Sequence, residues 1–180
     1  MEMGGGNRML KVAGIIIIIF ASTGLGITFA NDMKKRVEHM KTLKKMIMML
    51  DGEIKYANSP LAEAFYNIAK RIEYPFSDFL NQVAKELEAF TGNTFKIVWR
   101  NHIEQDLKQT KLTAKDKEEL KNLGENMGYL DREMQHNSIM LYGEQLEKEI
   151  TEADGELQAK MKVYHSLGIM GGLFLAVILL

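Results

Sequence analysis

Residues 58–72 read NSPLAEAFYNIAKRI, the pattern of an amphipathic helix with a defined start. Ser59 can cap such a helix with its hydroxyl, and Pro60 fits the first helical position, where a missing N–H costs nothing. Apolar residues then recur every three or four positions and predict one buried face. This apolar stripe consists of Leu61, Ala64, Phe65, Ile68, Ala69 and Ile72.

The same helical spacing continues on both sides of this stretch. Six helices are expected, over about residues 32–56, 59–74, 76–90, 94–107, 113–127 and from 131 onward. The first carries a buried seam of Val37, Met40, Leu43, Ile47, Leu50 and Ile54, with Met46, Met48 and Met49 beside it. Thr94 is expected to cap the fourth helix, residues 113–116 form a capping-box-like start, and Trp99 is expected in the core. No segment alternates with a period of two, so the predicted fold is an all-α helical bundle.

Both ends of the chain have the composition of membrane spans. Residues 12–30 are uncharged after a leader of residues 1–11, and residues 166–180 are uncharged within a second predicted span, 161–180. About 20 helical residues cross a bilayer core of about 30 Å. A cleaved signal peptide is the alternative for the first stretch, because TFA precedes ND, and a buried core helix is the alternative for the second.

The basic residues predict the orientation of the segment between the spans. They follow the first span as Lys34, Lys35, Arg36, Lys41, Lys44 and Lys45, and they precede the second as Lys160 and Lys162. Because basic residues favour the cytoplasmic side, residues 31–160 are expected to form a cytoplasmic domain of a bacterial membrane protein, or an exported one if the first span is a signal peptide. Two pairs of small residues could bring helices close within the membrane. They are Ser22 with Gly26, and Gly168 with Gly172.

Composition and motifs exclude several classes of function. The 180 residues carry a net charge of −1 and no cysteine, which argues against nucleic-acid binding, disulfides and thiolate chemistry. No phosphate-binding loop or nucleophile elbow is present. Glu133 and His136 have the spacing of a di-iron ligand pair, but such sites need a second copy that the chain lacks. We therefore expect no enzyme activity, cofactor, metal or small-molecule substrate, and a role in protein contact.

Two stretches resemble the stage III sporulation protein AB family of endospore-forming bacteria: LDGEIKYANSPLAEAFYNIA, residues 50–69, and GYLDREMQHNSIMLYGEQLEKEI, residues 128–150. In the first, the matching residues are Glu53, Ser59, Pro60, Leu61, Glu63, Ala64 and Phe65. In the second, they are Gly128, Asp131, Arg132, Glu133 and Gln135. The arrangement of two spans and the glycine-rich final span are also similar to the family.

The resemblance implies a role. The soluble domain of that family is similar to the cytoplasmic domain of the F-type platform protein of type II secretion systems. The expected partners are a secretion-type ATPase, the AA member of the same group, and other membrane components of a transenvelope channel complex in the mother-cell membrane facing the forespore. The alternatives are a membrane-bound enzyme or di-metal protein, and an unrelated two-span scaffold or signalling protein without enzymatic activity.

The charged residues of the second motif predict two kinds of contact. Asp131 and Glu133 stand where acidic side chains favour a helix start. Arg132 is unfavourable at that end of a helix, so we expect it either to contact a partner or to pair with an acidic residue on a neighbouring helix, with Glu53 as the first candidate.

Overall fold

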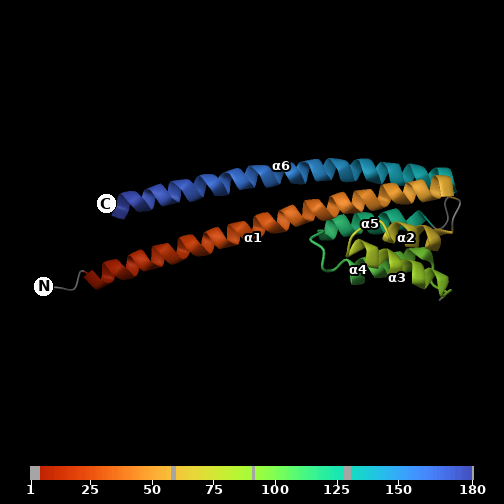
Figure 1. Cartoon of the computed structure of the whole chain (residues 1–180), viewed down its shortest axis with the longest axis horizontal. Coiled ribbons are helices and arrows are strands. Elements are labelled where there is room, and N and C mark those ends of the chain that lie inside the picture. The colour runs from red at the N-terminus through yellow and green to blue at the C-terminus, as the bar shows by residue number, and fades with distance from the viewer. Residues whose placement is uncertain (1–4, 58–59, 91, 128–130, 180) are drawn as a thin grey trace. The chain divides into compact units, whose positions relative to one another are not determined.

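The computed structural model describes the backbone of residues 5–57, 60–90, 92–127 and 131–179. Within these ranges the chain is all-helical, with six α-helices, one π-helical turn and no strand, as the sequence predicts (Figure 1). The α-helices are α1 (Gly5–Gly52), α2 (Leu61–Ala69), α3 (Phe76–Glu88), α4 (Phe95–Asp106), α5 (Ala114–Met127) and α6 (Arg132–Leu179), and the π-helical turn is Glu53–Ala57.

The first and last helices are much longer than predicted. Each is a single helix of 48 residues, in which the expected span and the expected bundle helix follow one another without a break. Among the residues that the structure describes, no helix contains a stretch long and apolar enough to cross a membrane. The two spans remain a prediction.

The chain divides into two compact units. One contains residues Met1–Lys34 together with Ala153–Leu180, and the other contains Lys35–Glu152. Gly26, Ala153 and Leu157 are buried in the first unit. The second unit, called the bundle below, contains the four short helices and the adjoining parts of α1 and α6.

The core of the bundle is built around Trp99 on α4. The side chain is fully buried, packs edge-on against Phe79 with ring centres 4.9 Å apart, and stacks on Phe65 at 5.7 Å. Its indole N–H donates to the carbonyl of Leu120 on α5 at 2.8 Å. Because α2, α3, α4 and α5 pack in chain order, this one side chain contacts several of them, and the prediction that Trp99 is a core residue is confirmed.

The buried seam of α1 also follows the prediction. Val37, Met40, Leu43, Met46, Ile47 and Leu50 are buried. Ile54 lies in the π-helical turn and is only half-buried, whereas Met48 is 41% exposed and thus outside the core. A five-residue π-helical turn shifts the side chains that follow it, so the three-to-four spacing no longer predicts burial at Ile54.

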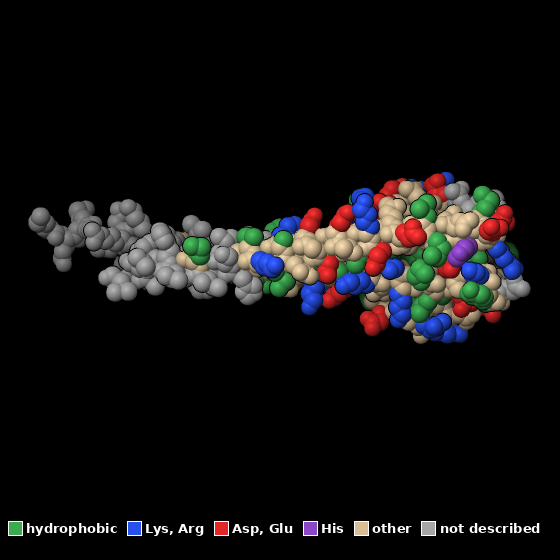
Figure 2. Space-filling model, turned by 90° about the horizontal axis from the view of Figure 1, so that it is seen from above, with side chains coloured by type: hydrophobic (Ala, Val, Ile, Leu, Met, Phe, Trp, Pro, Cys, Tyr) green, Lys and Arg blue, Asp and Glu red, His purple; other side chains and the backbone are tan. Residues whose placement is uncertain are grey.

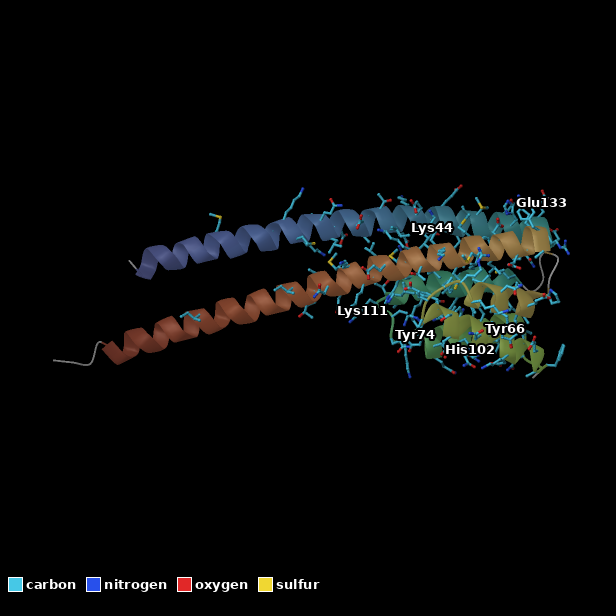
Figure 3. The ribbon with its side chains drawn as sticks, in the orientation of Figure 1. Lys44, Tyr66, Tyr74, His102, Lys111 and Glu133 are labelled. Atoms are coloured by element: carbon cyan, nitrogen blue, oxygen red, sulfur yellow. The ribbon has the colours of Figure 1, made fainter. Side chains whose placement is uncertain are left out.

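Ion pairs hold α1 against α5 and α6. Arg36 donates to both carboxylate oxygens of Asp116, at 2.9 and 2.7 Å, and the Asp116 side chain is only 1% exposed. Burial alone would raise the pKa of Asp116, but hydrogen bonds from Arg36 and Thr113 outweigh it and lower the pKa. Lys44 pairs with Glu147 on α6 at 2.6 Å (Figure 3). These pairs join segments far apart in the sequence.

Helix starts are fixed by local hydrogen bonds at two of the predicted positions. The Thr113 N–H donates to Asp116 at 2.8 Å while the Asp116 N–H donates to the Thr113 hydroxyl at 3.2 Å, which confirms the capping box before α5. Asp131 accepts the Met134 N–H at 2.9 Å and caps α6. Thr94 flanks α4 with extended backbone but forms no capping bond with its side chain.

The face of the molecule in Figure 2 shows acidic and basic side chains interspersed, with hydrophobic side chains between them.

Candidate functional site

An apolar groove lies where the start of α2, the end of α3 and the start of α4 meet. Its volume is about 560 Å³. It is lined by Pro60, Leu61, Ala62, Glu63, Tyr66, Leu87, Glu88, Phe90 and Phe95. We call it the α2–α4 groove.

The charged residues of the groove are both acidic. Glu63 and Glu88 are exposed, and none of the residues that line the groove is basic. The Tyr66 hydroxyl donates to Glu88 at 3.1 Å (Figure 3). Desolvation and the Glu88 carboxylate raise the pKa of Tyr66, so the phenol stays a hydrogen-bond donor at neutral pH. The groove therefore offers apolar walls with negative charge.

Phe90 is held in an unfavourable position beside these walls. Its φ of 47° lies in the left-handed region, which costs a non-glycine residue about 1–2 kcal/mol. The side chain is nevertheless 91% exposed, so no core packing offsets this cost. A strained backbone that presents an aromatic ring to solvent is typical of a functional position.

A network of side chains links Asn93, which precedes α4, to α3 and α4. Asn93 donates to one oxygen of Glu86 at 3.0 Å, and the other oxygen lies 2.9 Å from His102 Nε2. His102 Nδ1 lies 2.7 Å from Asp106 on its own helix, α4 (Figure 3). This network joins α3, Asn93 and α4.

The first sequence motif contributes both to the groove and to the core beneath it. Pro60, Leu61 and Glu63 line the groove, whereas Ala64 and Phe65 are buried.

Two predictions about this motif need correction. Leu61 is half-buried and not part of the core, because its side of the helix faces the groove. Pro60 flanks α2 with extended backbone, at φ −53° and ψ 147°, and does not occupy its first helical position. Glu53 is half-buried in the π-helical turn, and Ser59 lies outside the described residues.

The second sequence motif organises the start of α6. Gln135 donates to the carbonyl of Met127 at 2.6 Å and so ties α6 to the end of α5. Arg132 and Glu133 are exposed, and the predicted pair between Arg132 and Glu53 is not among the ion pairs of the described residues. Gly128 lies outside the described residues.

The two quoted stretches of sequence meet through a pair that was not predicted. His136 Nδ1 lies 2.5 Å from Asp51 Oδ1, which joins α6 to α1. His136 is thus engaged with a carboxylate of the bundle. In the described part of the chain, no group of three or more histidine or acidic residues is placed to hold a metal ion.

The proposed membrane-packing residues can be placed only in part. Gly26 is buried in α1. Ser22 lies in the same helix and Gly168 and Gly172 lie in α6, but the surroundings of these three residues are outside the description.

The sequence did not predict the remaining groove residues. Phe90 was expected within the third helix, 76–90, but α3 ends at Glu88 and Phe90 takes a positive φ with its side chain exposed. Tyr66, Glu88 and Phe95 have no distinctive spacing that indicates a site. One signal was available, because Phe90 directly precedes Thr-Gly-Asn, a run of turn-forming residues that favours the end of a helix.

The fold defines the class of protein as a small all-α bundle, built from four short helices and the adjoining parts of two long ones. The sequence model of the family "Stage III sporulation protein AB" matches residues 11–180. Stage III sporulation protein AB of Bacillus subtilis (strain 168) is 32% identical over 174 residues, which cover 96% of this chain and 100% of that protein. A solved structure of stage III sporulation protein AB matches with a TM-score of 0.64 and 26% identity, over 69% of this chain and 97% of that chain. The chain belongs to the stage III sporulation protein AB family and is a sporulation-associated protein.

Proposed function

We propose that this protein is a membrane-anchored platform of a stage III sporulation complex, which couples a cytoplasmic secretion-type ATPase to the membrane part of the assembly. The observation that carries the proposal is the placement of the first motif. Pro60, Leu61 and Glu63 face an accessible groove, where a partner can reach them. Motif residues that served stability alone would be expected in the core. The proposed role is protein contact without catalysis.

The anchoring part of the proposal rests on the ends of the chain. The uncharged residues 12–30 belong to α1, and most of the uncharged residues 166–180 belong to α6. Basic residues flank the segment between them, which favours a cytoplasmic bundle in the mother cell. Two anchors would limit the orientation of the bundle relative to a motor that binds it.

Topology can be tested directly because the chain has no cysteine. Lys108 is exposed in the turn after α4, so Lys108→Cys provides one labelling site. In intact cells a membrane-impermeant maleimide should leave it unlabelled, and in lysed cells the same reagent should label it. Labelling in intact cells would overturn the cytoplasmic placement and favour export after signal-peptide cleavage.

The partner is tested with the full chain in detergent or in a reconstituted membrane. A tagged chain should retain the AA-type ATPase of the stage III group through size-exclusion chromatography. The matched control is the same chain unfolded by urea before immobilisation. Equal retention by the folded and the unfolded chain, or none by either, would overturn the coupling role.

A further inference from the structure

We propose that the α2–α4 groove docks a partner segment that inserts an apolar side chain and flanks it with lysine or arginine. The inference deepens the proposed function, on which it rests for the identity of the partner, and it states the chemistry that the groove selects. The groove has apolar walls from Leu61, Leu87 and Phe95, and this surface can accept an apolar anchor.

Charge complementarity selects the residues around the anchor. Glu63 and Glu88 line the groove and are exposed, and no basic residue lines it to neutralise them. Glu88 accepts one hydrogen bond, from Tyr66, and a carboxylate has room to accept several more. Lysine or arginine beside the anchor can therefore pair with both carboxylates, which steers association and fixes the register of the bound segment.

The form of the groove favours a protein segment over a small molecule. Small-molecule sites are typically enclosed and contain polar groups that fix the orientation of the ligand. Here the two carboxylates are exposed, and Phe90 is almost fully accessible. An apolar segment laid along such a groove is a common mode of peptide recognition.

The backbone of Phe90 supplies an independent argument. A phenylalanine at φ 47° with a 91% exposed side chain is unfavourable in the isolated bundle. Contact with an inserted apolar side chain would bury part of this ring. Asn93, three residues after Phe90, is tied to Glu86 on α3, and Glu86 in turn contacts His102 on α4. Binding of a partner to the Phe90 ring would therefore account for the unfavourable backbone conformation of this residue.

Two probes test the inference with the full chain. The first is the purified AA-type ATPase. The second is a synthetic amphipathic peptide with leucine on one face and lysine on the other, compared with the same peptide carrying glutamate in place of lysine. The chain should bind the lysine peptide and not the glutamate peptide, and the affinity should fall as salt is added. Equal binding of both peptides would overturn the proposed selectivity.

Charge reversal assigns this binding to the groove. Glu63→Lys and Glu88→Lys should each weaken binding of the lysine peptide by about tenfold or more, and together they should remove most of the salt dependence. The matched controls are Glu144→Lys and Leu141→Ala, because both residues are exposed on α6 and neither lines the groove. These controls should bind as the wild type does. Loss of binding in the controls to the same extent would show nonspecific attraction and refute the assignment.

Phe90→Asn separates binding from folding. Asparagine tolerates the left-handed conformation, so this variant should unfold at a urea concentration equal to or higher than that of the wild type. It should nevertheless bind the peptide and the ATPase more weakly. A variant that binds as tightly as the wild type would refute a role for Phe90 in docking.

The failure of this inference differs from the failure of the proposed function. If the ATPase binds the wild type and all groove variants equally, the groove is not its docking site, although the coupling role stands. If the lysine peptide binds in the groove but the ATPase does not bind the wild type, the groove inference stands and the proposed partner is wrong. Self-association of the chain that is abolished by Glu63→Lys would make a second copy the occupant and overturn the proposal of a basic partner segment.

Discussion

Replacement of Gly124 by alanine is expected to destabilise the bundle, although alanine generally favours helix over glycine. Gly124 is buried in α5, directly against the indole ring of Trp99. A methyl group at this position would lie 2.6 Å from Trp99 Nε1 and 2.7 Å from Cγ, and closer still to Cδ1. Real Cβ contacts essentially never fall below 3.0 Å, so either the helix or the ring must move.

The ring has little room to move. Trp99 is fully buried between the rings of Phe65 and Phe79, and its N–H donates to Leu120. Overpacking of this kind costs about 1–3 kcal/mol, and loss of the indole hydrogen bond adds about 0.5–1.5 kcal/mol. The higher helix propensity of alanine returns about 1 kcal/mol. The expected net loss in the free energy of unfolding is therefore about 2 kcal/mol.

Urea unfolding of the full chain measures this difference, and Trp99 is the single tryptophan, so its fluorescence reports on the affected site. The matched control is Gly143→Ala on α6. There a methyl group would meet only the Met48 sulfur at 3.5 Å, an ordinary van der Waals contact. Gly143→Ala should leave stability unchanged or raise it by up to about 1 kcal/mol. The reasoning is refuted if Gly124→Ala unfolds at the same or a higher urea concentration than the wild type.

Three further predictions follow from burial and pairing. Burial lowers the pKa of His39 below 6.5, and its Nδ1 accepts a backbone N–H. The unfolded chain therefore binds more protons than the folded chain, and the free energy of unfolding should fall as the pH drops through about 6.5. In the His39→Gln variant, the urea midpoint should change less between pH 7 and pH 5 than it does in the wild type. Asp116→Asn should lower the free energy of unfolding, measured in urea, by about 1–3 kcal/mol, because Arg36 loses its charged partner. In the wild type the pKa of Asp116 is lowered, so this contribution to stability should persist until the pH falls below about 3.8. Phe65→Ala should lower the free energy of unfolding by about 3–5 kcal/mol, whereas Leu61→Ala, at a half-buried position, should lower it by only about 1 kcal/mol. Equal melting points for the two variants would contradict the placement of Leu61 in the groove.

The features that the sequence predicted correctly depend on neighbouring residues. The all-α fold, the capping box of Thr113 and Asp116 and the cap at Asp131 each depend on residues within one or two helical turns. The apolar spacing also predicted the burial of Phe65 and Trp99, because a wide apolar stripe on a helix requires a partner surface.

The features that the sequence missed depend on contacts between distant segments or on where a helix ends. Arg36 and Asp116 are 80 residues apart, and no local pattern selects this pair over the predicted pair of Arg132 and Glu53. Phe90 continues the apolar stripe of α3, but two residues beyond the end of the helix its backbone takes a positive φ. The shape of the groove depends on where α3 ends and how Phe90 is placed, so the family motif beside it could be identified from the sequence while the groove could not.

The ion pairs that hold α1 also determine when this helix can acquire its partners during synthesis. Lys44 leaves the ribosome 103 residues before Glu147 does, and Arg36 leaves 80 residues before Asp116. At a translation rate of about 5–20 residues per second, roughly 5–20 seconds pass between the synthesis of the α1 seam and the synthesis of the part of α6 that pairs with it. During that interval the buried side chains Met40, Leu43 and Ile47 have no completed surface to cover them. The nascent chain therefore passes through a period in which binding by a chaperone would protect it from aggregation.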